Sequence, residues 1–171
     1  MKLFSACLLF MLSLETGFAE TRDAHKNFFD FKFGDFKSEL ATAKKEGKSG
    51  ILIMFEQADC PFCFRMENTI LSQSEVQDYY HRNFLIFTVD IRGSLPMQDF
   101  KGKETTEKAF SVERRVYGTP LFDFFDLNGE LITRFPGSAK NVDEFMLLGR
   151  CVAEGDCKKM SFNAYKRRLK K

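Results

Sequence analysis

The segment Ile51–Cys63, with the sequence ILIMFEQADCPFC, decides how this chain folds. It begins with an apolar run that predicts a buried strand over 51–56. Cys60 and Cys63 follow, separated by two residues, so a disulfide between them can close within one helical turn. Pro61 suits the first position of a helix, where its missing N–H costs nothing, and we predict a helix that begins at Cys60. Unpaired N–H groups at that end favour the thiolate, the form that attacks disulfides. The pair is therefore predicted to cycle between dithiol and disulfide.

Length and composition set the limits of this prediction. A chain of 171 residues fits one domain with a substantial core. The formal net charge of +2 is too small to indicate a nucleic-acid partner. No stretch beyond the N-terminus is long and apolar enough to span a bilayer. We expect a monomer.

The N-terminus has the pattern of a signal peptide. Met1–Lys2 is a short basic start, Leu3–Leu14 is apolar, and Gly17-Phe18-Ala19 places small residues before a cleavage site. We predict a signal peptide over 1–19 with cleavage after Ala19, and hence export to a bacterial periplasm, with the extracellular space as the other destination. An uncleaved membrane anchor and a lipoprotein modified at Cys7 are the alternatives.

Cleavage after residue 19 would leave two local cysteine pairs, Cys60 with Cys63 and Cys151 with Cys157. An even count of locally paired cysteines suits an oxidising compartment. Residues six apart rise about 9 Å along a helix, too far for a disulfide, so a Cys151–Cys157 bridge requires a bend that Gly155 permits. We interpret this pair as a structural disulfide. The alternatives are a second redox pair and a zinc site built from all four cysteines.

The remaining pattern alternates helices and strands. A lead-in over 20–33 carries a phenylalanine cluster and is predicted to pack on the domain, and a short strand is one form that this packing could take. Strand 84–90 is apolar almost throughout, as a central parallel strand would be, and Asn128-Gly129 between two apolar runs indicates a β-hairpin. The other predicted elements are helices over 34–46, 75–82, 105–116 and 141–152, a loop over 92–103, and hairpin strands over 121–126 and 131–135.

The chain ends in a basic tail over 154–171, tethered by the predicted Cys151–Cys157 bridge. We interpret it as solvated and partly frayed, the alternative being a site for an anionic partner or membrane surface. His25 and His81 stand isolated in the sequence and are interpreted as surface or packing residues. The sequence contains no metal or Ser/His/Asp constellation, and we predict neither a metal nor a cofactor.

Residues 34–153 resemble the thioredoxin superfamily. The resemblance is carried by Cys60-Pro61-Phe62-Cys63, by Gly118-Thr119-Pro120 about sixty residues later, and by the hairpin around Asn128-Gly129. It implies an α/β, thioredoxin-like fold in which helices flank a central mixed sheet. It also implies that Pro120 is cis and lies beside the cysteines. The backbone of Thr119 would then be free to pair with an extended substrate segment.

Two shorter motifs are similar to the exported, Sox-type (sulfur-oxidation) thioredoxins: Phe55-Glu56-Gln57 before a C-P-aromatic-C, and Lys45-Glu46-Gly47-Lys48. This similarity implies a protein-disulfide oxidoreductase that keeps periplasmic protein thiols reduced. Its partners would be protein thiol or disulfide substrates and an upstream membrane or periplasmic thiol donor. The alternatives are a disulfide oxidase or isomerase with the same site, and a peptide-binding module without redox turnover.

The resemblance also assigns roles within the site. Cys60 would be the exposed nucleophile and Cys63 the resolving cysteine, with Pro61 and Phe62 tuning the redox potential. Asp59 and Met54 depart from the family, which has Trp and a buried Asp at these positions. Glu56 could take over proton transfer, or it could be a solvated carboxylate at a strand end. Glu56 and Asp59 would raise the pKa of the Cys60 thiol, and Arg65 could offset them.

Overall fold

The computed structural model describes residues 20–31 and 34–170. The predicted signal peptide, and Phe33 of the phenylalanine cluster, lie outside these residues. None of the helices in the described ranges has the length and apolar character needed to cross a membrane.

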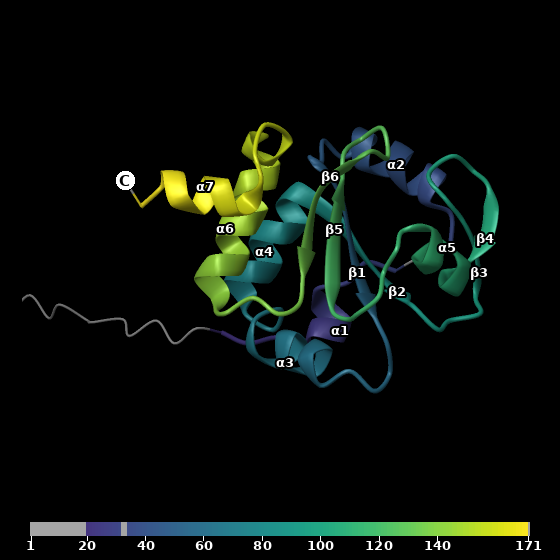
Figure 1. The fold of residues 1–171 in the computed structure, drawn as a ribbon, viewed down its shortest axis with the longest axis horizontal. Helices are drawn as coiled ribbons and strands as arrows, with labels where there is room; N and C mark the ends of the chain where they lie inside the picture. The colour runs from purple at the N-terminus through teal and green to yellow at the C-terminus, as the bar shows by residue number, and fades with distance from the viewer. Residues whose placement is uncertain (1–19, 32–33, 171) are drawn as a thin grey trace, which may run out of the picture.

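A four-stranded mixed sheet forms the centre of the molecule (Figure 1). Its order is β2-β1-β5-β6, where β1 pairs with β2 in parallel and with β5 in antiparallel fashion. The strands are β1 (Gly50–Glu56), β2 (Phe84–Asp90), β5 (Leu121–Phe125) and β6 (Leu131–Pro136). The mixed α/β sheet expected from the sequence is therefore confirmed.

Helices cover both faces of this sheet, which explains why β1 is apolar at successive positions. Leu52 and Met54 point to one face, where α3 (Pro61–Thr69), α4 (Ser74–Asn83) and α6 (Val142–Ala153) pack. Ile51 and Ile53 point to the other face, where α2 (Phe36–Lys45) and α5 (Glu107–Glu113) pack. Alternate strand residues thus enter two separate cores.

The prediction that strand 84–90 is central was wrong, because β2 lies at the edge of the sheet. The N-terminal segment covers that edge. The amide of Asp30 donates to the carbonyl of Ile86 at 2.7 Å, and the amide of Ile86 donates to the Asp30 carboxylate at 2.7 Å. An apolar strand reports that both of its faces are buried and carries no information about its edges, which is why the sequence pattern was misleading.

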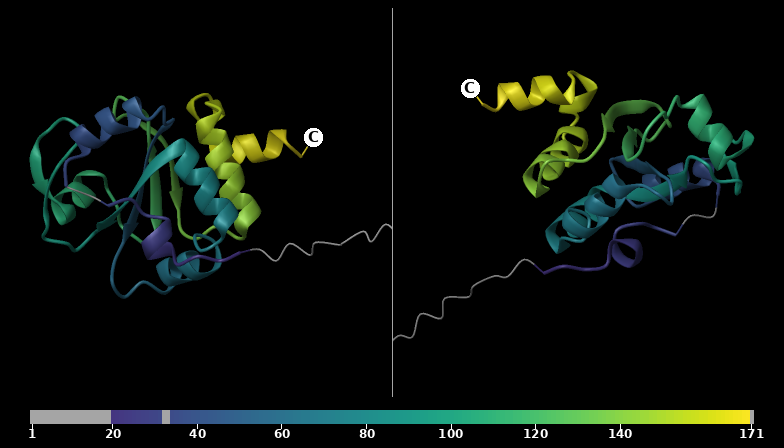
Figure 2. Two further views of the ribbon diagram at one scale, coloured as in Figure 1. Left: turned by 180° about the vertical axis from the view of Figure 1, so that it is seen from behind. Right: turned by 60° about the horizontal axis from the view of Figure 1, so that its bottom comes forward.

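The N-terminal segment forms a short helix, α1 (Ala24–Asn27), and not the strand considered from the sequence. The Asp23 side chain caps this helix, and Phe28 behind it is fully buried. Thr21 makes a single β-bridge with Gln73. Figure 2 shows the segment running across the outside of the domain.

The region over 92–116 departs most from the prediction. Two short strands, β3 (Pro96–Gln98) and β4 (Glu104–Thr106), pair with each other. The first lies inside the predicted loop over 92–103, and the second follows directly after it. Thr106 caps α5, so the helix begins two residues later than predicted and ends at Glu113, before Arg115 with its positive φ of 55°. Strands of three residues are too short to show an alternating pattern.

The C-terminal residues are folded, so their interpretation as a frayed tail was wrong. Gly155, with φ +80°, turns the chain after α6 into a 3₁₀ turn (Asp156–Lys158), and α7 (Phe162–Arg168) follows. Phe162 and Tyr165 are buried against the core. Their spacing of three residues puts both on one face of α7, and that face anchors the basic helix.

Candidate functional site

The cysteine pair lies at the start of α3, as predicted. Cys60 is the N-cap residue, and Pro61 occupies the first helical turn. The Cys63 amide donates to Cys60 Sγ at 3.1 Å, and the two sulfur atoms form a disulfide of 2.13 Å. Sγ thus takes the place of the oxygen that usually caps a helix.

The expectation that Cys60 is exposed was wrong for this disulfide form. Cys60 is 7% exposed and Cys63 is 3% exposed, and both belong to the core beneath α3. The Sγ of Cys60 turns inward to the Cys63 amide, which removes it from solvent. Phe62, between the cysteines, remains 59% exposed. The accessible surface at the motif is therefore formed by Pro61 and Phe62.

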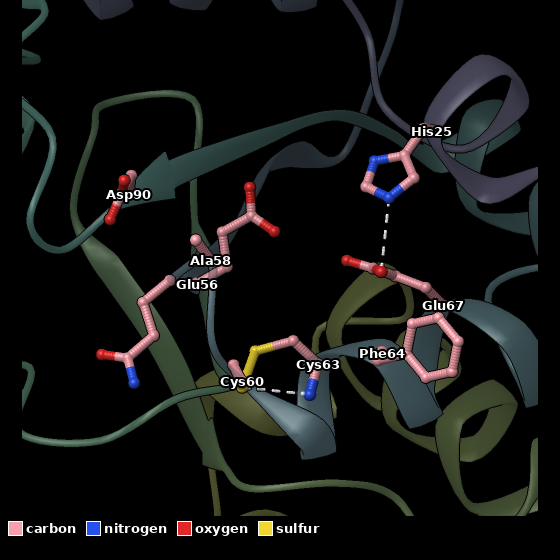
Figure 3. Close-up of a pocket in the computed structure, with 9 residues that line it drawn as sticks. His25, Glu56, Ala58, Cys60, Cys63, Phe64, Glu67 and Asp90 are labelled. Atoms are coloured by element: carbon pink, nitrogen blue, oxygen red, sulfur yellow. Dashed lines mark hydrogen bonds and ion pairs between the residues drawn. A yellow bond between two sulfur atoms is a disulfide. The ribbon is translucent and has the colours of Figure 1, made fainter.

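A pocket of about 420 Å³ lies beside the disulfide. It is bounded by both cysteines and by residues from four other parts of the fold, as Figure 3 shows. The charged or titratable residues in its lining are His25, Glu56, Glu67 and Asp90. Four titratable side chains thus lie around a pocket that the disulfide also borders.

Glu56 lines this pocket at the end of β1, and its residue is half-buried. Burial raises the pKa of the Glu56 carboxyl, and the nearby charges of Glu67 and Asp90 raise it further. His25 and a hydrogen bond with Thr88 act in the opposite direction. Glu56 is therefore a partly buried carboxylate in the pocket and not the fully solvated carboxylate that was the alternative. A role in proton transfer stays a prediction.

His25 is a surface residue, as predicted, with a side chain that is 67% exposed, but it is not isolated in the fold. Its Nε2 lies 3.3 Å from Oε2 of Glu67, and its ring lines the pocket beside the disulfide. His81 also has partners, since its Nε2 lies 2.9 Å from the carbonyl oxygen of Asn27. A single histidine has no spacing pattern, so only its neighbours in the fold could assign it to the site.

Pro120 reaches the same end of the molecule through the sheet. The Thr119–Pro120 peptide bond is cis. Phe55 pairs with Leu121, so continuing this antiparallel register by one residue places Pro120 level with Glu56. Two further bonds connect the motifs: the Gly137 amide donates to the Pro120 carbonyl at 2.8 Å, and the neighbouring Ser138 hydroxyl donates to the Phe62 carbonyl at 3.2 Å.

The other residues singled out in the sequence lie around this centre. Asp59 and Arg65 are exposed. Met54, at the position of the family's buried acid, is fully buried in the core beneath α3. An apolar thioether cannot take up a proton at this depth, which leaves the carboxylate of Glu56 as the nearest replacement on the same strand.

Cys151 and Cys157 form their own disulfide, with an S–S distance of 2.02 Å. Cys151 is fully buried, Cys157 is 5% exposed, and neither lines the pocket beside Cys60 and Cys63. The two pairs are thus closed separately, in contrast to the four-cysteine zinc alternative. The structural role of this second bridge stays a prediction.

Residues 36–148 match the family model described as "Thioredoxin-like domain", and the chain therefore belongs to this family. A thioredoxin-fold protein from Helicobacter pylori is similar, with 19% identity, 72% and 87% of the two chains covered, and a TM-score of 0.58. A thioredoxin from Thermus thermophilus has 26% identity, coverage of 72% and 88%, and a TM-score of 0.55. A DsbH oxidoreductase has 17% identity, coverage of 75% and 88%, and a TM-score of 0.56. No curated protein matches the sequence.

These comparisons establish the thioredoxin-like family and fold, and the Sox-type subgroup stays a prediction. The family and the Cys60–Cys63 disulfide together support a thiol–disulfide oxidoreductase in general terms.

Proposed function

We propose that this protein is an exported thiol–disulfide oxidoreductase of the Sox-type thioredoxin group, which reduces disulfides of periplasmic proteins. The observation that carries the proposal is the Cys60–Cys63 disulfide at the start of α3, beside a pocket lined by a half-buried carboxylate. Export rests on the predicted signal peptide over 1–19 and on the even number of cysteines that its removal would leave.

The reaction begins with the reduced pair. The thiolate of Cys60 attacks one sulfur of a substrate disulfide, a mixed disulfide forms, and the first substrate sulfur leaves as a thiolate that takes a proton from solvent. Cys63 then transfers its thiol proton to Glu56 and attacks Cys60 Sγ. The second substrate sulfur leaves and is protonated. Two electrons have passed to the substrate, and an upstream dithiol donor must return two electrons and two protons.

Substrate docking is assigned to the residues around this centre. Thr119 directly precedes β5 and is half-buried, and we assign its backbone to pair with an extended substrate segment beside the cysteine pair. Exposed Phe62 offers an apolar contact next to Cys60. Pro61 keeps the first turn of α3 helical and leaves no amide there to be satisfied.

Insulin reduction by dithiothreitol tests the reaction class. We expect the wild-type chain to accelerate precipitation of the insulin B chain and Cys60→Ser to abolish the acceleration. Cys63→Ala should accumulate a mixed disulfide with its substrate, which mass spectrometry would identify. A wild-type chain without activity would instead support the peptide-binding module.

The redox potential of the pair tests the direction. Equilibration with glutathione buffers should give a potential in the reducing part of the family range. For this two-electron couple, a difference of 30 mV corresponds to about 1.4 kcal/mol. A potential close to that of the strongly oxidising family members, about −120 mV, would contradict the reductase and favour the oxidase or isomerase.

Glu56 has a separate test. We expect Glu56→Gln to slow the resolution of the mixed disulfide about a hundredfold, because general-base assistance is lost while side-chain size is kept. The first attack by Cys60 should change little. Equal slowing of both steps would show that Glu56 supports the site structurally and does not accept the Cys63 proton.

A further inference from the structure

A residue from outside the thioredoxin-like match completes the pocket beside the disulfide. The match covers residues 36–148, whereas His25 belongs to the preceding helix α1. Its ring nevertheless lines the same pocket as Cys60 and Cys63 and projects toward Glu67, as Figure 3 shows. The N-terminal segment therefore contributes directly to the redox site.

Several contacts hold this segment in place. The Arg22 amide donates to the Ser72 carbonyl at 2.7 Å, and the Ser74 amide donates to the Glu20 carbonyl at 2.9 Å. Beyond α1, Phe28 is fully buried. Anchors on both sides of α1 fix its position, so His25 is held over the pocket and is not part of a loose tail.

Glu67 connects His25 to the resolving cysteine. Cys63 and Glu67 are four residues apart on α3 and thus lie on the same face of the helix. The Glu67 side chain is 9% exposed, whereas the His25 side chain is 67% exposed. A carboxylate buried to this extent needs a polar partner, and His25 supplies it at 3.3 Å.

The charges around His25 come from every neighbouring element. In the pocket beside the disulfide they are Glu67 from α3, Glu56 from β1 and Asp90 from β2. In the two other pockets that His25 lines they are Arg22, Asp23, Lys26, Asp30 and His81. Three carboxylates thus surround the entrance to the sulfur atoms, and His25 is the cation-forming group among the pocket-lining residues.

We propose that the His25–Glu67 pair is a positioning element of the redox site, which sets the charge around Glu56 and thereby the pH at which Cys63 gives up its proton. This inference rests on the proposed function. His25 and Glu67 act on Glu56 in opposite directions: the charge of His25 lowers the pKa of Glu56, and the charge of Glu67 raises it. Glu56 must be deprotonated to accept a proton, so the rate of the resolving step falls at low pH. We call this fall the acid limb of the pH–rate profile, and the two residues move it in opposite directions.

The resolving step can be observed in a single turnover. The reduced chain is mixed with a limiting amount of dithiobis-nitrobenzoate, an aromatic disulfide whose thiolate product is coloured. Attack by Cys60 releases one thiolate and forms a mixed disulfide, and attack by Cys63 on that mixed disulfide releases the second. The rate of the second phase is measured as a function of pH.

We expect His25→Asn to move the acid limb of the second phase to higher pH by about half a unit to one unit. Glu67→Gln should move it to lower pH, and His25→Lys, which keeps the positive charge, should remain close to wild type. The first phase should change less than about twofold in each variant, because none of these changes removes Cys60 or its helix cap.

His81→Asn is the matched control. His81 contacts the same N-terminal segment through Asn27 but does not line the disulfide pocket. We expect its profile to match wild type. An equal shift in His81→Asn and His25→Asn would show that segment packing causes the effect, and shifts of the same sign in His25→Asn and Glu67→Gln would likewise overturn the inference.

The proposed function and this inference fail in different ways. A wild-type chain that releases no thiolate, or a single equivalent, overturns both. A wild-type chain with two phases, combined with a His25→Asn variant of unchanged pH profile, overturns the role of the His25–Glu67 pair alone.

Discussion

Removing the Cys151–Cys157 bridge should cost stability and leave the redox reaction intact. The bridge joins residues six apart at the end of α6, and both cysteines are buried. Loop entropy for a ring this small contributes about 2 kcal/mol to the free energy of unfolding. In a domain of this size, that loss lowers Tm by about 4 to 8 °C. We therefore expect this decrease for the double variant Cys151→Ala/Cys157→Ala.

Insulin reduction by the same variant should stay within about twofold of wild type at a temperature where the variant is folded. The reason is spatial, since neither Cys151 nor Cys157 lines the pocket beside Cys60 and Cys63. Urea titration and thermal melting measure the stability, and the insulin assay measures turnover.

The matched control is Cys60→Ala/Cys63→Ala, which removes the other disulfide and should abolish insulin reduction while the chain stays folded. The reasoning would be refuted by a folded Cys151→Ala/Cys157→Ala variant whose turnover falls tenfold or more. Such a loss would identify the second pair as an electron relay, and unchanged stability would contradict its structural role.

Three further predictions concern the core. The Arg134 side chain donates two hydrogen bonds to the fully buried Asp123 carboxylate, and Arg134→Met removes both. We therefore expect the free energy of unfolding, measured with urea near neutral pH, to fall by about 3 kcal/mol. Burial raises the pKa of Asp123, so its protonated form is favoured by folding and the loss should shrink toward about pH 4. Tyr80→Phe removes a buried hydroxyl that donates to the Phe145 carbonyl at 2.6 Å, and should cost about 1 kcal/mol. Gly149→Ala should lower Tm although alanine favours helices, because its Cβ would lie 3.0 Å from the Tyr80 ring.

Much of the fold could be predicted because its signals are local. The apolar run before Cys60, Pro61 after it, and Asn128-Gly129 between two strands each specify structure through neighbouring residues. The edge position of β2 and the paired strands β3 and β4 could not be predicted in this way. The position of a strand at the edge or centre of a sheet depends on which other strands pair with it. Strands as short as β3 and β4 also have too few residues to show an alternation of apolar and polar side chains.

For the site, the sequence by itself predicted a disulfide-forming cysteine pair at a helix start, since two-residue spacing and a helix start are properties of adjacent residues. For Glu56, two residues beyond Met54 on one strand, the sequence left open a role in proton transfer or a solvated carboxylate at a strand end. Only the tertiary structure decided that Cys60 is buried in the disulfide form and that His25 joins Glu67 beside it. Those contacts bring α1, α3 and β1 together across long stretches of chain, and burial and charge pairing depend on this packing, which no local pattern encodes.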